Sequence, residues 1–258
     1  RRLDDRAILP FNWLSSGLSS GLRDEPHRIE SEYTNKRIHI LKYDLIIISA
    51  SKDSSLKKMT QDAIDSCLAD RADVNVILVE TYQKTEYKNV DKYVLFEGEF
   101  NYNHCLNLGL KHRKGDVQIL ANNDIIFMPG WSSIGYTMRE YGYLSTSALS
   151  NHPRQKLFKR GDYAYEGYEI CRYVTGWCLF VDSKVWDIIG PLDETYQFWY
   201  SDDMYVHQLK AKGIKHYLIC NVVVNHYISR TLMKTDRASR VKLTNAERKT
   251  IQGKNRRN

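Results

Sequence analysis

The segment from Gly115 to Trp131 reads Gly-Asp-Val-Gln-Ile-Leu-Ala-Asn-Asn-Asp-Ile-Ile-Phe-Met-Pro-Gly-Trp, and the rest of the chain can be arranged around it. Its apolar run Val117–Ala121 predicts a short buried strand. That strand ends at three polar residues, Asn122, Asn123 and Asp124, before a second apolar run begins. Because open α/β sheets bind their ligands at the carboxyl ends of strands, Asp124 is the first candidate for a metal ligand.

Upstream of this segment, apolar runs alternate with helical patterns. Leu45–Ser49 and Val74–Val79 predict buried strands, and apolar residues at three- and four-residue spacing over Leu56–Leu68 predict the helix between them. A short strand over Tyr93–Phe96 and a helix from about Tyr102 follow. This alternation indicates a parallel sheet with helices on both faces, so we expect an α/β fold with three layers, α/β/α, around a mostly parallel central sheet.

A tyrosine-rich stretch opens the second half of the chain, where the alternation continues. The elements predicted there are a strand at Thr175–Val181, a short helix at Val185–Ile189, a helix led by Asp202 and Asp203, and a strand at Tyr217–Val224 that leads to Asn225 and His226. The chain has neither a Gly-x-Gly-x-x-Gly motif after its first strand nor a Walker loop. A bound nucleotide would therefore be held without the usual phosphate cradle.

The positive charge of the chain lies in its carboxyl-terminal tail. Residues 229–258 have ten Lys and Arg against two acidic residues, a charge of +8, whereas the other residues sum to −1 of the total +7. Such a tail attracts polyanions such as nucleic acid or an anionic membrane, although a solvated tail that only aids solubility explains it equally well. Residues 1–43 are polar and predict an extension, which leaves 44–228 as the folded domain.

Composition also bounds the setting of the protein. The five cysteines are scattered without a Cys-x-x-Cys pair, which argues against a zinc knot and against a dense disulfide framework. No apolar run approaches the roughly 20 residues needed to cross a bilayer. We therefore expect a cytoplasmic protein without a transmembrane segment.

The order of motifs resembles the GT-A fold glycosyltransferases, especially the family 2 type that uses nucleotide sugars, over about Asp44 to Ser229. The matching segments are Leu-Ile-Ile-Ile-Ser-Ala-Ser at 45–51, Ile-Leu-Val-Glu-Thr at 77–81, the Asn-bearing helix after Phe100 with Leu-Ala-Asn-Asn-Asp at 120–124, Thr-Gly-Trp-Cys-Leu-Phe-Val at 175–181, Asp193 to Asp203, and Val-Asn-His at 224–226. Asn122 replaces the first acid of the family's Asp-x-Asp site. Glu80 stands where Asp is commoner. Together, and in the correct order, these segments are fairly specific.

The resemblance implies roles for the residues at these positions. Nucleotide-sugar contacts fall on Ser49, Asp53, Glu80, Asn107, Asn122 and Asn123, with Glu80 near the nucleobase. Acceptor contacts fall on Gly176, Trp177 and Trp199, since aromatic faces stack on sugars and bases. The donor would be a UDP-sugar in first place, with GDP- and dTDP-sugars as alternatives.

The chemistry of sugar transfer asks for the same residue types. Asp124 and His226 would hold Mn²⁺ or Mg²⁺ against the diphosphate leaving group. A carboxylate must also take the proton of the acceptor hydroxyl. Asp203 is the first choice for this base and Asp202 the second, and the alternative is that both merely cap their helix.

These observations predict a metal-dependent, inverting hexosyltransferase-like enzyme. Its acceptor would be a glycan, free or lipid-linked, or a modified base of DNA flipped out of the duplex. A nucleotidyltransferase, or an inactive module that binds a nucleotide or a glycan on the same fold, are the alternatives.

Overall fold

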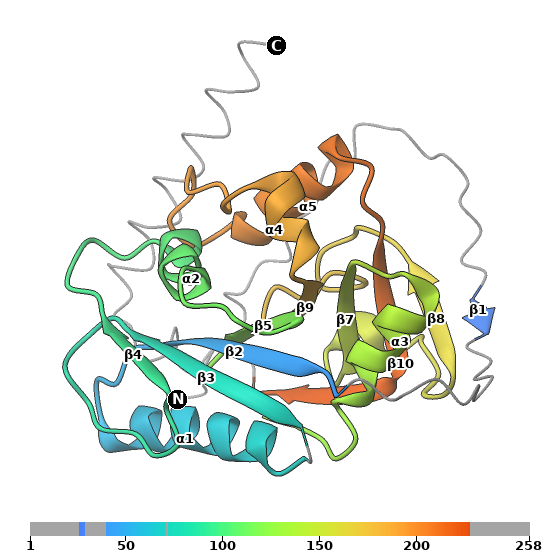
Figure 1. The fold of residues 1–258 in the computed structure, drawn as a ribbon. Coiled ribbons are helices and arrows are strands. Elements are labelled where there is room, and N and C mark those ends of the chain that lie inside the picture. Colours follow the sequence, from blue (N-terminus) through green and yellow to red (C-terminus); the bar gives the residue numbers. More distant parts are fainter. Residues whose placement is uncertain (1–25, 29–39, 71, 228–258) are drawn as a thin grey trace, which may run out of the picture.

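The computed structural model of the chain describes residues 26–28, 40–70 and 72–227 (Figure 1). The basic tail and most of the amino-terminal extension lie outside these residues. The helices are α1 (Ser54–Leu68), α2 (Tyr102–Leu110), α3 (Ser133–Tyr141), α4 (Lys184–Ile189) and α5 (Ser201–Ala211). The strands are β1 (His27–Arg28), β2 (Lys42–Ser49), β3 (Asp73–Glu80), β4 (Lys92–Leu95), β5 (Val117–Asn122), β6 (Ile125–Phe127), β7 (Ser145–Ser150), β8 (Tyr163–Glu166), β9 (Cys178–Asp182) and β10 (His216–His226).

Within the described ranges these strands form a single sheet. Its order is β1-β8-β10-β7-β9-β5-β2-β3-β4, and β6 pairs with β10 beside this path. β4, β3, β2 and β5 are parallel neighbours, and β7 is parallel to β10. β9 lies between these two groups and is antiparallel to both β5 and β7. From β4 to β10, β9 is therefore the strand that runs against the others, and the prediction of a mostly parallel centre is confirmed.

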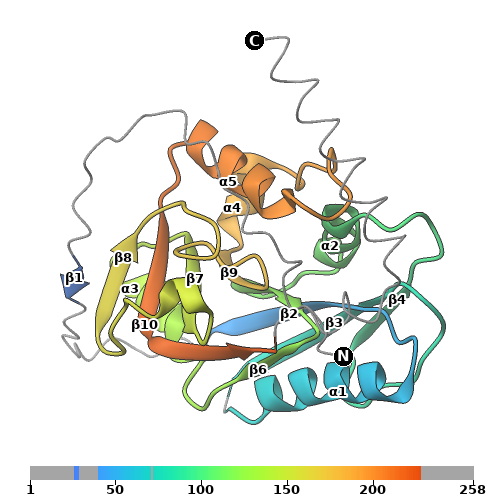
Figure 2. The same cartoon turned by 180° about the vertical axis from the view of Figure 1, so that it is seen from behind.

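Side-chain alternation along β2 explains the layers. Leu45 and Ile47 join a core cluster with residues of α1 and α3, whereas Ile46 and Ile48 join a second cluster with residues of α2, α4 and α5. Successive strand residues point to opposite faces, so a strand made wholly of apolar residues needs a cover on each side. Figures 1 and 2 show α1 on one side of the sheet and α2, α4 and α5 on the other. The predicted three-layer α/β/α fold is confirmed.

The structure differs from the sequence-based expectations at a few elements. β6, α3, β7 and β8 were not predicted, and the strand expected at Thr175–Val181 begins at Cys178. At the amino end, β2 begins at Lys42, and Leu41 and Tyr43 are buried in the core. The folded domain therefore includes residues before 44.

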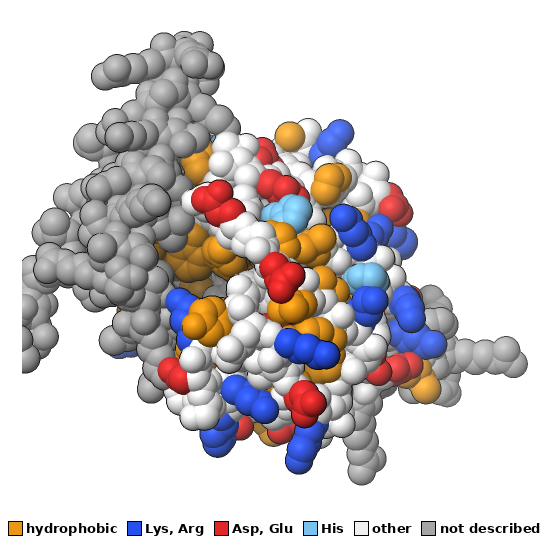
Figure 3. Space-filling view, turned by 90° about the vertical axis from the view of Figure 1, so that its left-hand side faces the viewer, with side chains coloured by type: hydrophobic (Ala, Val, Ile, Leu, Met, Phe, Trp, Pro, Cys, Tyr) orange, Lys and Arg blue, Asp and Glu red, His pale blue; other side chains and the backbone are white. Residues whose placement is uncertain are grey.

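Two findings concern the setting of the protein. All five cysteines are free, and four of them are buried. Over the residues that the structure covers, no helix is both long enough and apolar enough to cross a membrane. On the face seen in Figure 3, acidic and basic side chains alternate and do not separate into patches of one sign.

Candidate active site

The parallel strands bring three of the predicted site residues to one edge of the sheet. In the register of the sheet Ser49 at the end of β2 stands beside Glu80 at the end of β3, and Ile48 stands beside Asn122 at the end of β5. Since carboxyl ends of parallel strands share an edge, the register alone places these side chains together. Ser49, Glu80 and Asn122 therefore share one edge of the sheet, and their roles in binding stay a prediction.

Asp124 and His226 meet at the same edge although they are far apart in the sequence. The chain turns after β5 into β6, and β6 pairs with β10 so that Ile125 faces His226. Asp124 Oδ1 lies 3.2 Å from His226 Nε2, and the two side chains are 5% and 8% exposed. The contact has the distance of an ion pair but does not have the geometry of a hydrogen bond.

The His226 ring is held in place by its neighbours, but its nitrogens make no hydrogen bond to the described residues. It stacks on Trp177 with ring centroids 4.8 Å apart and planes 9° apart. Its backbone N–H donates to Asn151 Oδ1, and Asn151 Nδ2 donates to its carbonyl. Both ring nitrogens are buried without a hydrogen bond to any described residue. Such nitrogens cost about 1–3 kcal/mol each, which a ligand or ion would recover.

A carboxylate oxygen and an imidazole nitrogen suit a divalent ion such as Mn²⁺. Among the residues that the structure describes, no cluster of three His, Cys, Asp or Glu side chains could hold a metal. Two protein ligands would leave coordination positions for diphosphate oxygens and water. Asp124 and His226 are therefore of the residue types that would bind the predicted ion, with His226 lacking another partner for its ring nitrogens in the described chain.

Asp202 lies in the first turn of α5. A Cβ atom placed on Gly176 would lie 2.7 Å from Asp202 Oδ2, so the carboxylate rests directly on the glycine backbone. Burial, and secondly the adjacent Asp203 carboxylate, raise the pKa of Asp202 to about 7. Burial also raises the pKa of Asp203. Two neighbouring acids with raised pKa values are unusual for exposed helix caps and typical of functional sites.

Tyr102, at the start of α2, joins the two halves of the site and was not among the predicted site residues. Its hydroxyl lies 2.7 Å from Asn122 Oδ1 and 3.2 Å from the carbonyl of Gly176. Its pKa is raised by burial and, after that, by the carboxylates of Asp202 and Asp124. Both carboxylates therefore lie near the Tyr102 hydroxyl. No sequence motif near Tyr102 predicts this arrangement.

Glu80, which was predicted to contact the nucleobase, accepts hydrogen bonds from groups within the protein. It is fully buried, and its Oε1 accepts hydrogen bonds from the backbone N–H groups of Ser51, Thr81 and Tyr82 at 3.0–3.1 Å. Its Oε2 accepts a hydrogen bond from the hydroxyl of Tyr87, which also contacts Ser49 and Ser51. The Glu80 carboxylate thus shapes the loops after β2 and β3.

Three further residues predicted to bind the nucleotide sugar have contacts within the protein. Asp53 caps α1 by accepting from the N–H groups of Ser55 and Leu56. Asn107 joins α2 to Leu192 and Glu194 through both ends of its amide. Asn123 donates to Thr60 Oγ1 at 3.0 Å. These contacts explain why such side chains stand at these positions. For Asp53 and Asn107, the structure adds no support for direct binding of the nucleotide sugar.

The two tryptophans expected at the acceptor side differ in exposure. Trp177 is 7% exposed and has His152 5.0 Å away in addition to His226, so its faces are covered and it supports the His226 ring. Trp199 is 39% exposed, just before α5, and packs edge-on against Phe198. Of the two, Trp199 has a face that an acceptor could reach.

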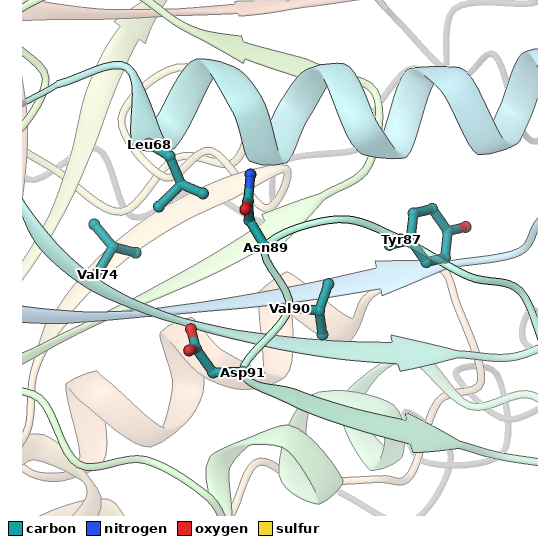
Figure 4. Close-up of a pocket in the computed structure, with 6 residues that line it drawn as sticks. All are labelled: Leu68, Val74, Tyr87, Asn89, Val90 and Asp91. Atoms are coloured by element: carbon teal, nitrogen blue, oxygen red, sulfur yellow. The ribbon is translucent and has the colours of Figure 1, made fainter.

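A cavity of about 370 Å³ lies elsewhere, where the loop before β4 passes α1 and β3 (Figure 4). It is lined by Leu68, Val74, Tyr87, Asn89, Val90 and Asp91. None of these is an expected site residue, and the cavity does not include Asp124 or Asp202.

Comparison with known proteins identifies the fold. No protein-family model matches the chain, and no curated protein does. Among solved structures, it is similar to the crystal structure of GalNAc-T7 with UDP, GalNAc and Mn²⁺, at 12% identity and a TM-score of 0.57 over 72% of this chain and 43% of that one. It is also similar to residues 1–349 of TarS from S. aureus, at 11% identity and a TM-score of 0.54 over 72% of this chain and 60% of that one.

In both cases this chain spans less than two thirds of the protein it matches. Both structures are GT-A glycosyltransferases. At this level of identity the likeness concerns the arrangement of the backbone. The chain has the GT-A fold.

Proposed function

We propose that this protein is a metal-dependent glycosyltransferase that moves a sugar from a nucleotide-sugar donor to an acceptor hydroxyl with inversion. The observation that carries the proposal is the buried Asp124–His226 pair, whose ring nitrogens have no hydrogen-bond partner in the described chain, near the Asp202 carboxylate. The GT-A fold supports the same reaction class.

On the donor side, Asp124 and His226 would hold the ion, which would neutralise the charge that develops on the leaving diphosphate. Mn²⁺ and a UDP-sugar are our first choices, because the similar GalNAc-T7 structure contains UDP and Mn²⁺. Ser49, Asn122 and Asn123 are candidates for donor contacts, since they lie at the same sheet edge.

On the acceptor side, we propose Asp202 as the base in place of Asp203. A base that works near neutral pH needs a pKa near 7, and Asp202 has one. Asp202 also rests on Gly176 and lies near Tyr102, whereas the largest charge effect on Asp203 comes from His207 on its own helix. With one base and no second nucleophile proposed, displacement would occur once and invert the anomeric centre.

The acceptor that we propose is a hydroxyl of a glycan, with Trp199 as a stacking face. The similar GalNAc-T7 structure contains GalNAc, which supports a sugar ligand. A DNA acceptor was predicted from the basic tail, which lies outside the described residues. DNA is therefore included among the acceptors in the experiment below.

The test is turnover of UDP-, GDP- and dTDP-sugars with Mn²⁺, with oligosaccharide acceptors or hydroxymethylated DNA. We expect release of UDP, a loss of about 10²-fold or more on Asp124→Ala or Asp202→Asn, and a smaller loss on Asp203→Asn. Asp187→Asn, at an exposed carboxylate on α4, is the matched control.

Three results would contradict the proposal in different ways. Unchanged turnover in Asp124→Ala would exclude the metal pair. Equal losses in Asp202→Asn and Asp187→Asn would exclude Asp202 as the base. Nucleotide binding without any turnover would favour an inactive binding module, and pyrophosphate release from a nucleoside triphosphate would favour a nucleotidyltransferase.

A further inference from the structure

A buried network of polar side chains lies beneath the candidate base. It consists of Ser145 and Ser147 on β7, His216 at the start of β10, and Tyr205 on α5, each at most 1% exposed. Polar groups in a core are costly unless every one is paired. Here the pairing is complete and joins three elements that are separate in the sequence.

The direction of the hydrogen bonds follows from the histidine. Burial lowers the pKa of His216 to about 3, so the ring is neutral and has a single N–H. Its Nε2 lies 3.2 Å from the carbonyl oxygen of Tyr173, which can only accept, so Nε2 carries the hydrogen. Nδ1 then accepts from Ser145 Oγ at 2.8 Å, and Ser145 Oγ in turn accepts from the hydroxyl of Tyr205 at 2.6 Å.

A second branch holds the segment that follows Tyr173. Ser147 Oγ lies 3.1 Å from His216 Nε2 and accepts a hydrogen bond from the backbone N–H of Thr175 at 3.0 Å. The Thr175 hydroxyl donates to the carbonyl of Cys178 at 2.7 Å. The turn that contains Gly176 is therefore fixed from inside the core.

The two branches converge on one contact of the site. Tyr205 lies three residues after Asp202, on the same side of α5, and Gly176 directly follows Thr175. The network thus sets how closely α5 approaches the glycine on which the Asp202 carboxylate rests. We assign no contact with the reacting atoms to the members of the network. They would act through the position of Asp202.

We propose that His216 is a positioning residue, which with Ser145, Ser147 and Tyr205 fixes the Asp202 carboxylate against Gly176. The inference rests on the proposed function, because it assigns the network to the base of that reaction. A purely structural network would contribute to stability alone. If the network positions Asp202, a change in the network should shift the pKa of Asp202. If the network is purely structural, that pKa should stay the same.

Tyr205→Phe tests this, because it removes one hydroxyl and keeps the ring. Tyr43→Phe is the matched control: Tyr43 is also 1% exposed, and its hydroxyl donates to the carbonyl of Ser132, near the amino end of α3 and away from the candidate site. The ionisation of Asp202 is followed by carbon NMR of protein labelled at aspartate carboxyls, with Asp202→Asn to assign the signal.

We expect the midpoint of Asp202 to stay near 7 in Tyr43→Phe and to move by roughly 0.5 or more in Tyr205→Phe, because burial and neighbours set it. The same midpoint in both variants would overturn the proposal. This readout does not require turnover, so it stays distinct from failure of the proposed function, which would be the absence of sugar transfer by the unmodified protein.

Kinetics supply a second readout. Tyr205→Phe should lower kcat by about tenfold or more with little change in KM for the donor, since misplacing a catalytic group affects the chemical step. Ser147→Ala should do the same, and Ser147→Thr, which keeps the hydroxyl on a strand, should restore kcat. A loss of thermal stability in Ser147→Ala with unchanged kcat would also overturn the proposal.

Discussion

Asp202 and Asp203 are adjacent, yet their surroundings give them different properties. The Asp202 carboxylate rests on Gly176, where there is no side chain to separate it from the backbone. Asp203 faces His207 one turn further along α5. The sequence predicts an acidic pair at this point and favours Asp203, whereas the contact of Asp202 with Gly176 depends on a glycine contributed by another segment.

The raised pKa of Asp202 has a consequence for stability. Its folded-state pKa of about 7 lies above the usual 3.8, so the fold favours the protonated carboxyl. This contribution is complete below about pH 4 and is lost as the pH rises through 7. Asp202→Asn should therefore raise the free energy of unfolding at pH 8, by at most about 4 kcal/mol at roughly 1.4 kcal/mol per pKa unit.

Urea unfolding at pH 8 and at pH 4.5 measures this difference, and we expect the gain to shrink at the lower pH. Asp187→Asn should show no such trend, because its carboxylate is exposed. A destabilised Asp202→Asn protein at pH 8 would contradict the interpretation. A gain in stability together with a loss of turnover would be the signature of a group kept for function.

At the residue level, strand order decides which of the predicted site residues lie close together. Asp124 and His226 meet because each lies at the end of a strand, and the strands pair. Asn107 and Glu80 stand at the expected places, but their side chains are used within the protein. Which way a polar side chain turns depends on partners contributed by distant segments, and this information is not local.

At the scale of elements, β7 explains why part of the fold was not predicted. Its sequence, Ser-Thr-Ser-Ala-Leu-Ser, is typical of a loop, since it lacks an apolar run. Its first three residues are nevertheless fully buried, because the hydroxyls of Ser145 and Ser147 pair with His216 and that of Thr146 with a neighbouring strand. Hydrophobic patterns cannot predict a strand whose burial depends on hydrogen bonds from elsewhere.

The loops after β2 and β3 also depend on one buried group. Glu80 accepts three backbone N–H groups and the Tyr87 hydroxyl. Glu80→Gln keeps the shape but replaces a carboxylate acceptor by a neutral amide, so the hydrogen bonds from the three backbone N–H groups become weaker. We expect a loss of about 1.5–3 kcal/mol in the free energy of unfolding, measured by urea denaturation.

Glu97→Gln, at an exposed carboxylate just after β4, is the control and should change stability little. The relative turnover of UDP-, GDP- and dTDP-sugars should stay the same in Glu80→Gln, because the carboxylate faces the backbone. A change in nucleotide preference at unchanged stability would instead restore Glu80 as a nucleobase contact.

For the molecule as a whole, the proposed metal site links the two halves of the sheet. Asp124 follows β5 and His226 ends β10, and β6 joins them. A ligand held by both residues should therefore stabilise the entire fold. At 100 times the dissociation constant, Mn²⁺ with UDP should add about 2.7 kcal/mol.

Thermal unfolding with and without Mn²⁺ and UDP measures this. The melting temperature should rise with the two together, return to its starting value on addition of EDTA, and not respond in Asp124→Ala. UDP that stabilises equally in the presence of EDTA would show that the nucleotide binds without the ion.

The antiparallel strand β9 also has a consequence for how the chain is made. β2, β3, β4 and β5 are complete by residue 122, and they can pair with one another as they leave the ribosome. β7 does not pair with them, because β9 lies between β7 and β5 in the sheet. β9 is complete only at Asp182. Until then β5 has an open edge of the kind that other chains can pair with. A chaperone that covers this edge until β9 is available would prevent such pairing.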